Sequence, residues 1–281
     1  MELVIGIDLG TTETKTGLFD REGHLLRLAR CGYPILSDRE AGCAEQDPET
    51  WWTAVCQSVR EVTCDIPASE LAALCVGGQG PSVVMLDADG RALYNAILWM
   101  DTRNVREREE LSQEMGHPVS PFAHLPMAMW MRRYRADAYR QARWFLAAWD
   151  YVAYRLCGRL ASSSLAYFQP FPPDEIEAAQ MVAEHFPEPL QAGTTIAGLS
   201  RPAAQETGLP AGLPVVAGVH DGIATFIGAG LVEEGRGADV NGTSGGLALC
   251  WNGPIAKPGI FSASWIRPPQ HIVGGAMATL G

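Results

Sequence analysis

The chain has 281 residues, of which 47% are hydrophobic and 19% are charged, and its 32 acidic and 21 basic residues give a net charge of −11. This apolar fraction is ordinary for a globular protein, so we expect a sizeable core and no wholesale disorder. The excess of acidic residues leaves no basic surface of the kind that nucleic acids bind, so we expect no nucleic-acid partner.

The cysteines and the first residues of the chain indicate its compartment. The seven cysteines are odd in number and form no C-x-x-C pair, so we interpret them as reduced thiols, which favours a cytoplasmic location. The first residues lack the basic and long apolar regions of a signal peptide, and no apolar run approaches the ~18 residues that span a bilayer. We therefore expect no membrane partner.

Three short strands are predicted at the start of the chain, over residues 3–7, 14–20 and 24–33. The first strand leads into Asp8 and a turn that contains a glycine and two threonines. Glycine lets the backbone approach a ligand closely, and threonine hydroxyls and turn N–H groups can bind phosphate oxygens. The turn residues are Gly10, Thr11 and Thr12.

The Asp8 carboxylate has two interpretations. It suits a Mg²⁺ ion that keeps most of its waters and is bound through one carboxylate and the phosphates of a nucleotide. Alternatively, it caps the backbone of its own turn, as aspartates in glycine turns do. The turn by itself leaves both interpretations open.

The middle of the chain alternates strands and helices. A helix is predicted over residues 48–62, with Pro48 at its first position, and a buried strand over 71–77. Further helices are expected over residues 102–115, 126–135, 148–157 and 175–185. Two groups of residues follow strand ends and could contact a hydroxylated ligand, or could form a simple turn and a helix start: Gln79, Gly80 and Pro81, and Trp99, Asp101 and Arg103.

Towards the C-terminus the order strand, turn, helix returns. A buried strand over 214–219 is followed by His220 and Asp221, and a helix continues through residue 227. Asp221 at the end of a strand could accept a proton from a substrate hydroxyl. Alternatively, it could cap the helix, because aspartate is a preferred N-cap residue. Of the six histidines only His220 has a site-like position.

Two further strands, over residues 238–241 and 247–251, are joined by a second glycine-rich turn. Its residues are Gly242, Thr243, Ser244 and Gly245, which repeat the chemistry of the first turn. The repetition suggests two related halves, of which the second has barely begun. Together the two turns predict a two-sided phosphate site.

In this order the segments resemble the FGGY carbohydrate kinases, most closely the xylulokinase-like branch. The matching stretches are residues 5–12, 45–48 with 51–52, 78–79, 97–99 with 101 and 103, 215–221 and 242–245. The resemblance implies an α/β fold of the actin-like, ribonuclease-H-like ATPase type, with a mixed five-stranded sheet and helices on both faces. It also implies phosphoryl transfer from ATP to a hydroxyl of a small sugar, polyol or sugar acid.

The resemblance also implies roles for individual residues. Asp221 becomes the catalytic base that activates the acceptor hydroxyl, and Asp8 becomes the ligand of Mg²⁺. The residues implied in binding ATP are Asp8, Gly10, Thr11, Thr12, Lys15, Gly242, Thr243, Ser244 and Gly245. Those implied in binding the acceptor are Gln79, Gly80, Pro81, Trp99, Asp101, Arg103 and Gly222. Such a transfer is catalysed mostly by positioning and charge neutralisation.

The chain departs from the xylulokinase pattern on the acceptor side. Gly80 and Pro81 stand where xylulokinases typically read Met and His, and Gly222 makes an Asp-Gly pair that is closer to gluconate kinases. Because a site that hydrogen-bonds a hydroxyl discriminates strongly, lost donors imply a different substrate. We therefore expect kinase chemistry with an acceptor other than xylulose.

The last residues are rich in glycine and resemble the middle of a domain. We expect one complete sugar-binding domain over residues 1–232 and the beginning of a nucleotide-binding domain over 233–281. Two alternatives stay open: a catalytically incompetent domain or fragment of such a kinase, and an actin-like ATPase with another acceptor. The sequence also leaves open whether the chain forms a homodimer.

Overall fold

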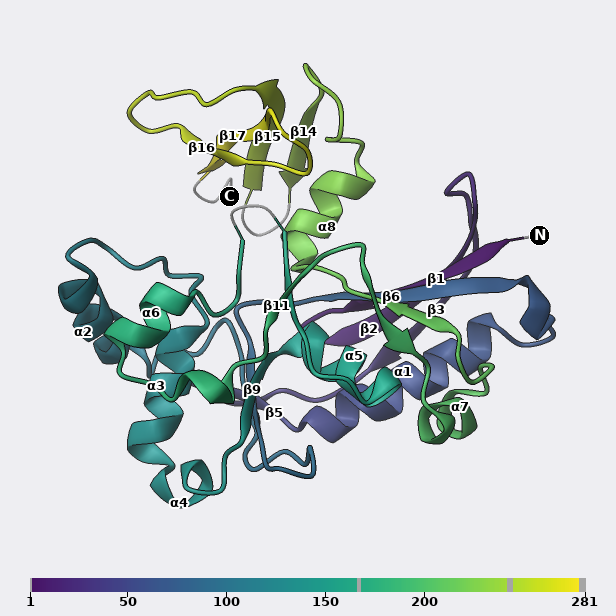
Figure 1. Cartoon of the computed structure of the whole chain (residues 1–281), viewed down its shortest axis with the longest axis horizontal. Helices are drawn as coiled ribbons and strands as arrows, with labels where there is room; N and C mark the ends of the chain where they lie inside the picture. The colour runs from purple at the N-terminus through teal and green to yellow at the C-terminus, as the bar shows by residue number, and fades with distance from the viewer. Residues whose placement is uncertain (1, 166–167, 242–244, 278–281) are drawn as a thin grey trace.

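The computed structural model describes residues 2–165, 168–241 and 245–277. Figure 1 shows a main sheet with helices below it and a smaller sheet above it, with α8 between the two sheets. The main sheet has six strands in the order β12-β13-β6-β1-β2-β3. These strands are β1 (Leu3–Leu9), β2 (Glu13–Asp20), β3 (Leu25–Gly32), β6 (Leu71–Gly78), β12 (Thr195–Gly198) and β13 (Pro214–Val216).

The main sheet is mixed, as predicted. β6 pairs in parallel with β1 and with β13, whereas β1, β2 and β3 are antiparallel to one another in turn. The predicted number of five strands is wrong, because the described part of this sheet contains a sixth strand, β12, at its edge. With only four residues, β12 is too short to show the alternation by which a strand is predicted.

Helices cover both faces of the main sheet, which confirms the predicted arrangement. On one face the helices are α1 (Pro48–Val62), α5 (Ala148–Cys157) and α7 (Arg201–Thr207). On the other face lies α8 (Asp221–Gly228), as Figure 1 shows.

The predicted helix over residues 48–62 is confirmed as α1. The Asp47 side chain accepts a hydrogen bond from Glu49 N (3.0 Å), and Pro48 occupies the first turn, where its missing N–H leaves no bond unmade. Trp51 and Val55 are fully buried on the face that packs against the sheet. The N-cap and the apolar spacing therefore both specify a helix at these residues.

A second sheet of five strands has the order β4-β5-β8-β7-β9. Its strands are β4 (Leu36–Asp38), β5 (Cys43–Gln46), β7 (Val83–Leu86), β8 (Ala96–Ile97) and β9 (Trp144–Ala147). The nearby helices are α2 (Val105–Met115), α3 (Leu125–Tyr134), α4 (Ala136–Tyr139) and α6 (Pro173–Ala178). This sheet could not be predicted from the sequence, because its short strands pair across long stretches of chain.

The remaining elements are short. They are the 3₁₀ helices η1 (Ala68–Glu70) and η2 (Ala183–His185) and the parallel pair of β10 (Ser162–Ser164) and β11 (Pro189–Gln191). The helix predicted over 175–185 is wrong, because α6 ends at Ala178 and Gln180 has a positive φ of 51°, which a helix cannot accommodate.

A third sheet of four strands, in the order β14-β15-β17-β16, follows α8. Its strands are β14 (Gly237–Asn241), β15 (Gly245–Asn252), β16 (Phe261–Ser264) and β17 (Gln270–Met277). The hairpin of β14 and β15 agrees with the sequence, whereas β16 and β17 were not predicted. Ile223 of α8 shares one core with Trp265 and Ile272. This core crosses the proposed boundary at residue 232, and the division into domains stays a prediction.

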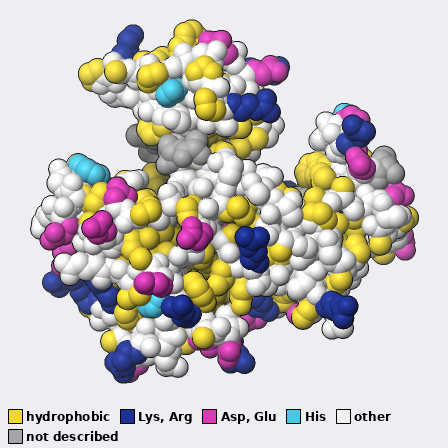
Figure 2. All heavy atoms as spheres, viewed as in Figure 1, with side chains coloured by type: hydrophobic (Ala, Val, Ile, Leu, Met, Phe, Trp, Pro, Cys, Tyr) yellow, Lys and Arg dark blue, Asp and Glu magenta, His cyan; other side chains and the backbone are white. Residues whose placement is uncertain are grey.

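Three observations concern the compartment and the partners that were predicted from the sequence. All seven cysteines are free. Within the described ranges, no helix combines the length and the apolar character needed to cross a membrane. On the face drawn in Figure 2, lysine and arginine side chains are scattered and gather into no patch.

Candidate active site

Three parallel strands of the main sheet, β1, β6 and β13, end at the same edge. Backbone hydrogen bonds join the last residues of β1 and β6 to the segments that follow β6 and β13, from Gln79 N to Leu9 O (2.8 Å) and from Gly78 N to Val219 O (3.2 Å). The carboxyl ends of neighbouring parallel strands are where α/β folds bind ligands. This edge therefore brings together three segments that lie far apart in the sequence.

Two carboxylates lie at this edge. Asp8 is in β1 and Asp221 is the first residue of α8, and their side chains are 46% and 43% exposed. Burial raises the pKa of the Asp221 carboxyl above its ordinary value, and the charge of Asp8 acts in the same direction, whereas the hydrogen bond from Gly222 N and the charge of Lys15 oppose the rise. A raised pKa makes Asp221 a stronger base than an ordinary carboxylate.

Lys15 reaches the same edge from the neighbouring strand. Asp8 and Lys15 are partners in the antiparallel pairing of β1 with β2. Lys15 Nζ lies 3.5 Å from Asp8 Oδ2 and 4.0 Å from Glu13 Oε1. Its side chain is 39% exposed, so its charge is accessible to an anionic ligand. The register of the sheet thus places Lys15 beside Asp8.

The turn after β1 is held through its carbonyl oxygens. Tyr33 Oη donates to Gly10 O (2.5 Å), and Gln46 Nε2 donates to Thr11 O (2.7 Å). A Cβ at Gly10 would lie 2.8 Å from Glu13 O, so the turn requires a glycine at this position. These contacts fix the backbone of the turn that is predicted to bind phosphate.

Thr11 of this turn lies beside Trp99. Trp99 Nε1 donates to Thr11 Oγ1 (3.0 Å), and Trp99 is 45% exposed. Thr12 is exposed. The structure therefore joins two segments that the sequence singled out separately, and the indole gives the edge an apolar wall.

Gln79 is connected to the turn through Gln46. Its side chain is buried, and its Nε2 donates to Gln46 Oε1 (3.1 Å), which also accepts a hydrogen bond from Trp51 Nε1 (2.8 Å). Gln79 Oε1 is buried and has no hydrogen-bond partner in the part of the chain that the structure describes. Gln79 thus supports the turn from within the protein.

Gly80 is tied to the start of α8 by His220. His220 Nε2 donates to Gly80 O (2.9 Å), and Gly222 N donates both to Asp221 Oδ1 (2.6 Å) and to His220 Nδ1 (3.1 Å). His220 is therefore the N-cap of α8, so the alternative role of Asp221 as the cap is wrong. Pro81 is buried.

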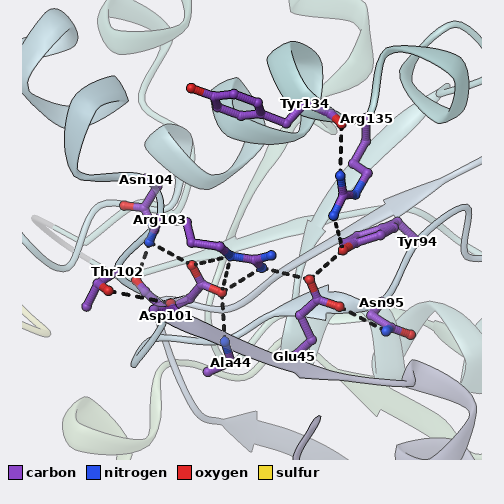
Figure 3. Close-up of polar contacts among 11 residues, drawn as sticks. Ala44, Glu45, Tyr94, Asn95, Asp101, Thr102, Arg103, Asn104, Tyr134 and Arg135 are labelled. Carbon is purple, nitrogen blue, oxygen red and sulfur yellow. Dashed lines mark hydrogen bonds and ion pairs between the residues drawn. The ribbon is translucent and has the colours of Figure 1, made fainter. Parts of the chain in front are cut away.

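Asp101 and Arg103 form a buried ion-pair network, drawn in Figure 3. Arg103 Nη2 lies 2.7 Å from Asp101 Oδ2 and 2.7 Å from Glu45 Oε1, and Ala44 N donates to Asp101 Oδ2 (2.9 Å). The Asp101 and Arg103 side chains are 1% and 15% exposed. Their polar atoms contact protein partners, so the network fixes the segment that carries Trp99.

The same network holds Glu45 in its charged form. Burial acts to raise the pKa of this carboxyl, but hydrogen bonds from Tyr94, Asn95 and Arg103 outweigh it and keep the pKa below its usual value. Figure 3 shows Tyr94 in turn accepting a hydrogen bond from Arg135. A direct contact of Asp101 or Arg103 with an acceptor stays a prediction.

Three residues near this edge were not predicted as site residues: Gln46, His124 and Trp149. His124 is buried, and its burial lowers its pKa to about 3, so its ring is neutral. It packs edge-on against Trp149, with 5.6 Å between ring centroids. A Cβ on Gly80 would lie 3.0 Å from Trp149 Cζ3 and 3.4 Å from His124 Nε2. Only long-range contacts, which carry no local signal, reveal these neighbours.

The second turn predicted to bind phosphate, residues 242–245, is described only at its last residue. Gly242, Thr243 and Ser244 lie outside the described residues. Gly245 is the first residue of β15, and its backbone pairs with Asn241. The assignment of residues 242–245 to phosphate binding therefore stays a prediction.

The donors at the edge fit a magnesium ion. Mg²⁺ prefers hard oxygen ligands and is commonly held by one or two carboxylates together with substrate phosphates. The half-exposed carboxylate of Asp8 supplies such an oxygen. Across the described ranges, no three histidine, cysteine, aspartate or glutamate side chains gather to hold a metal by themselves. An ion at Asp8 would therefore take its further ligands from water and from phosphate oxygens.

Comparisons with known proteins identify relatives of the chain. Residues 3–228 match the family model described as the FGGY family of carbohydrate kinases, N-terminal domain. The xylulose kinase of Bacillus subtilis (strain 168) is 28% identical over 264 residues, covering 87% of this chain and 53% of that protein. The autoinducer-2 kinase of Klebsiella pneumoniae is 27% identical, covering 98% and 55%. The chain thus spans about half the length of these curated relatives.

Solved structures share the fold. The xylulose kinase of Rhodospirillum rubrum superposes with a TM-score of 0.86 at 24% identity, covering 99% of this chain and 62% of that one. The gluconate kinase of Lactobacillus acidophilus gives 0.83 at 23% identity, covering 98% and 59%. At these identities the likeness shows the fold alone, and it confirms the actin-like architecture predicted from the sequence.

Proposed function

The chain belongs to the FGGY family of carbohydrate kinases, and we propose that it carries the acceptor site and the base of an ATP-dependent carbohydrate kinase. The reaction transfers the γ-phosphoryl group of ATP to a hydroxyl of a sugar, polyol or sugar acid. The observation that carries this proposal is the meeting of Asp8, Lys15 and Asp221 at one sheet edge, where the pKa of Asp221 is raised. The free cysteines favour a cytoplasmic location.

Asp221 is the base of the proposed reaction. Its carboxylate takes the proton of the acceptor hydroxyl while that oxygen bonds to the γ-phosphorus, and the bond from the γ-phosphorus to the bridging β-phosphate oxygen breaks. Gly222 N–H donates to Asp221 Oδ1, which leaves Oδ2 to take the proton. A positioned base of this kind contributes about 10²–10⁴-fold in rate.

Asp8 and Lys15 act on the phosphate side. Asp8 would hold Mg²⁺, which when bound neutralises charge on the transferring phosphate. Lys15 adds a positive charge beside it, and the turn of residues 10–12 offers hydroxyls and N–H groups. The proposed phosphate turn at 242–245, in the proposed beginning of a nucleotide-binding domain over residues 233–281, would add further donors to this side.

The acceptor is proposed to lie against Gly80, Pro81, Trp99 and Gly222. An exposed indole suits the apolar face of a sugar or polyol, while backbone groups near the glycines suit its hydroxyls. Asp101 and Arg103 contribute by holding the segment that presents Trp99. Relatives are named as kinases of xylulose, autoinducer-2 and gluconate, so membership of the family does not identify the acceptor. The acceptor has to be found by experiment.

A panel of acceptors tests the proposed function. ADP release is measured for the 281-residue chain together with any residues that flank it naturally, here called the full-length protein, with ATP and Mg²⁺ in the presence of pentoses, hexoses, polyols and sugar acids in turn. We expect one class to raise ADP release at least about tenfold over water and to yield a phosphate ester by ³¹P NMR. ADP release that no acceptor changes would indicate an ATPase, and no ADP release would indicate an incompetent domain; both contradict the proposal.

A further inference from the structure

His220 lies between the segment assigned to acceptor binding and the residue assigned to proton transfer. At the start of α8, its Nδ1 accepts a hydrogen bond from Gly222 N (3.1 Å). On the opposite side of the ring, Nε2 donates to Gly80 O (2.9 Å). The imidazole therefore bridges the turn after β6 and the first turn of α8.

The two hydrogen bonds define the protonation of the ring. Gly80 O can only accept, so Nε2 carries the hydrogen, and Gly222 N–H can only donate, so Nδ1 presents its lone pair. Both bonds together require the neutral ring in its Nε2–H tautomer. His220 Nδ1 also lies 3.3 Å from Asp221 Oδ1, and the two atoms share the Gly222 N–H.

Packing fixes the ring as well. Trp149 lies edge-on to His220 with 6.1 Å between ring centroids, and Phe168 lies at 5.5 Å. A Cβ added to Gly80 would lie only 2.8 Å from His220 Cδ2. The glycine and the histidine therefore fit each other, and a side chain at residue 80 would displace the ring from the start of α8.

We propose that His220 is a positioning residue, which holds the first turn of α8, and with it Asp221, at a fixed place relative to the Gly80–Pro81 turn and so to the acceptor hydroxyl. This inference rests on the proposed function. His220 takes no proton from the acceptor, because both ring nitrogens are bonded to backbone groups. Its contribution is orientation, to which the rate of transfer is sensitive because small misplacements of reacting groups are costly.

Nitrogen NMR of the histidine rings in the 281-residue chain tests the bridge without any assay of activity. We expect the signals that disappear in His220→Gln to show a protonated Nε2 and an unprotonated Nδ1. The exposed His117 provides the matched control, because His117→Asn should leave these signals in place. A ring of residue 220 in the Nδ1–H form, or in rapid exchange between the two tautomers, would overturn the inference.

Kinetics of the full-length protein test the positioning role. We expect His220→Ala to lower kcat at least about tenfold with a smaller change in the KM of the acceptor. His220→Gln, whose amide can still donate to Gly80 O, should recover part of kcat, and His117→Asn should match the wild type. A kcat of His220→Ala within about twofold of the wild type would overturn the inference.

Two further readouts separate the ways in which this test can fail. If the wild type shows no acceptor-dependent ADP release, the proposed function fails. The NMR result still tests whether His220 bridges Gly80 and Gly222. If His220→Ala does not fold by circular dichroism, Gly80→Ala takes its place, because its added Cβ displaces the ring. An unchanged kcat and unchanged ring signals in Gly80→Ala would overturn the inference.

Discussion

At the scale of single residues, the edge of the main sheet depends on side chains that fit one another across long stretches of chain. His220 and Gly80 are 140 positions apart, yet the imidazole fills the space that the glycine leaves and bonds its carbonyl oxygen. Gly222 N donates to one carboxylate oxygen of Asp221, which leaves the other oxygen for chemistry. No local pattern relates residues at such a separation, so this fit could not be predicted from the sequence.

Asp150 is a second residue whose environment has a measurable consequence. It lies near the start of α5, where Ser163 N lies 3.1 Å from each of its carboxylate oxygens. Burial raises its pKa to about 8 from an ordinary value of 3.8. The folded state therefore binds this proton more tightly than the unfolded state, so the stabilisation is complete below pH 3.8 and is lost as pH rises through about 8.

We predict that Asp150→Asn removes this pH dependence. Between pH 3.8 and about 8, the wild type should lose stability relative to the variant by up to about 1.4 kcal/mol per pH unit. Urea unfolding at a series of pH values measures the difference. Asp137→Asn, whose side chain is 92% exposed in the wild type, should retain the wild-type slope. A wild-type slope in Asp150→Asn would contradict the assignment.

At the scale of elements, the network around Arg103 joins three parts of the fold. Arg103 pairs with Glu45 at β5 and with Asp101 before α2, and its guanidinium lies 4.2 Å from the ring centroid of Trp130 in α3. Both carboxylates are almost fully buried. Removal of the guanidinium would leave two buried negative charges without a positive partner.

We predict that Arg103→Ala lowers the free energy of unfolding by about 3–5 kcal/mol, because breaking a buried pair leaves uncompensated charge. Arg103→Lys should recover only part of this loss, since lysine cannot reproduce the planar fork. Arg140→Ala, which removes an exposed pair with Asp137, should unfold like the wild type. Unchanged stability of Arg103→Ala together with lost acceptor binding would instead make Arg103 a direct ligand of the acceptor.

The elements predicted from the sequence are those with strong local signals. α1 has a cap, a proline at its first position and regular apolar spacing, and β1 buries every second residue. The second sheet and β12 lack such signals, because their strands have four residues or fewer. In the site, Asp8 and Asp221 follow from their positions at strand ends, whereas the support from Gln46 becomes visible only in the fold.

At the scale of the whole molecule, α8 connects the main sheet with the third sheet (Figure 1). The helix begins with Asp221 and shares a core with Trp265, whose Nε1 donates to Leu231 O (2.5 Å). Figure 2 shows the surface indented between the third sheet and the rest of the chain. The proposed base is therefore placed where the two parts meet, which suits a reaction that domain closure shields from water.

The measurement that tests the central claim most directly compares Asp221→Asn with the wild type in the full-length protein, using the acceptor identified by the panel. We predict that kcat falls about 10²–10⁴-fold while the Kd of the acceptor changes by less than about threefold. The acid limb of the wild-type pH profile should lie above the ordinary aspartate value, because burial raises the pKa of Asp221. Asp137→Asn should behave as the wild type. A kcat of Asp221→Asn within about tenfold of the wild type would contradict the account.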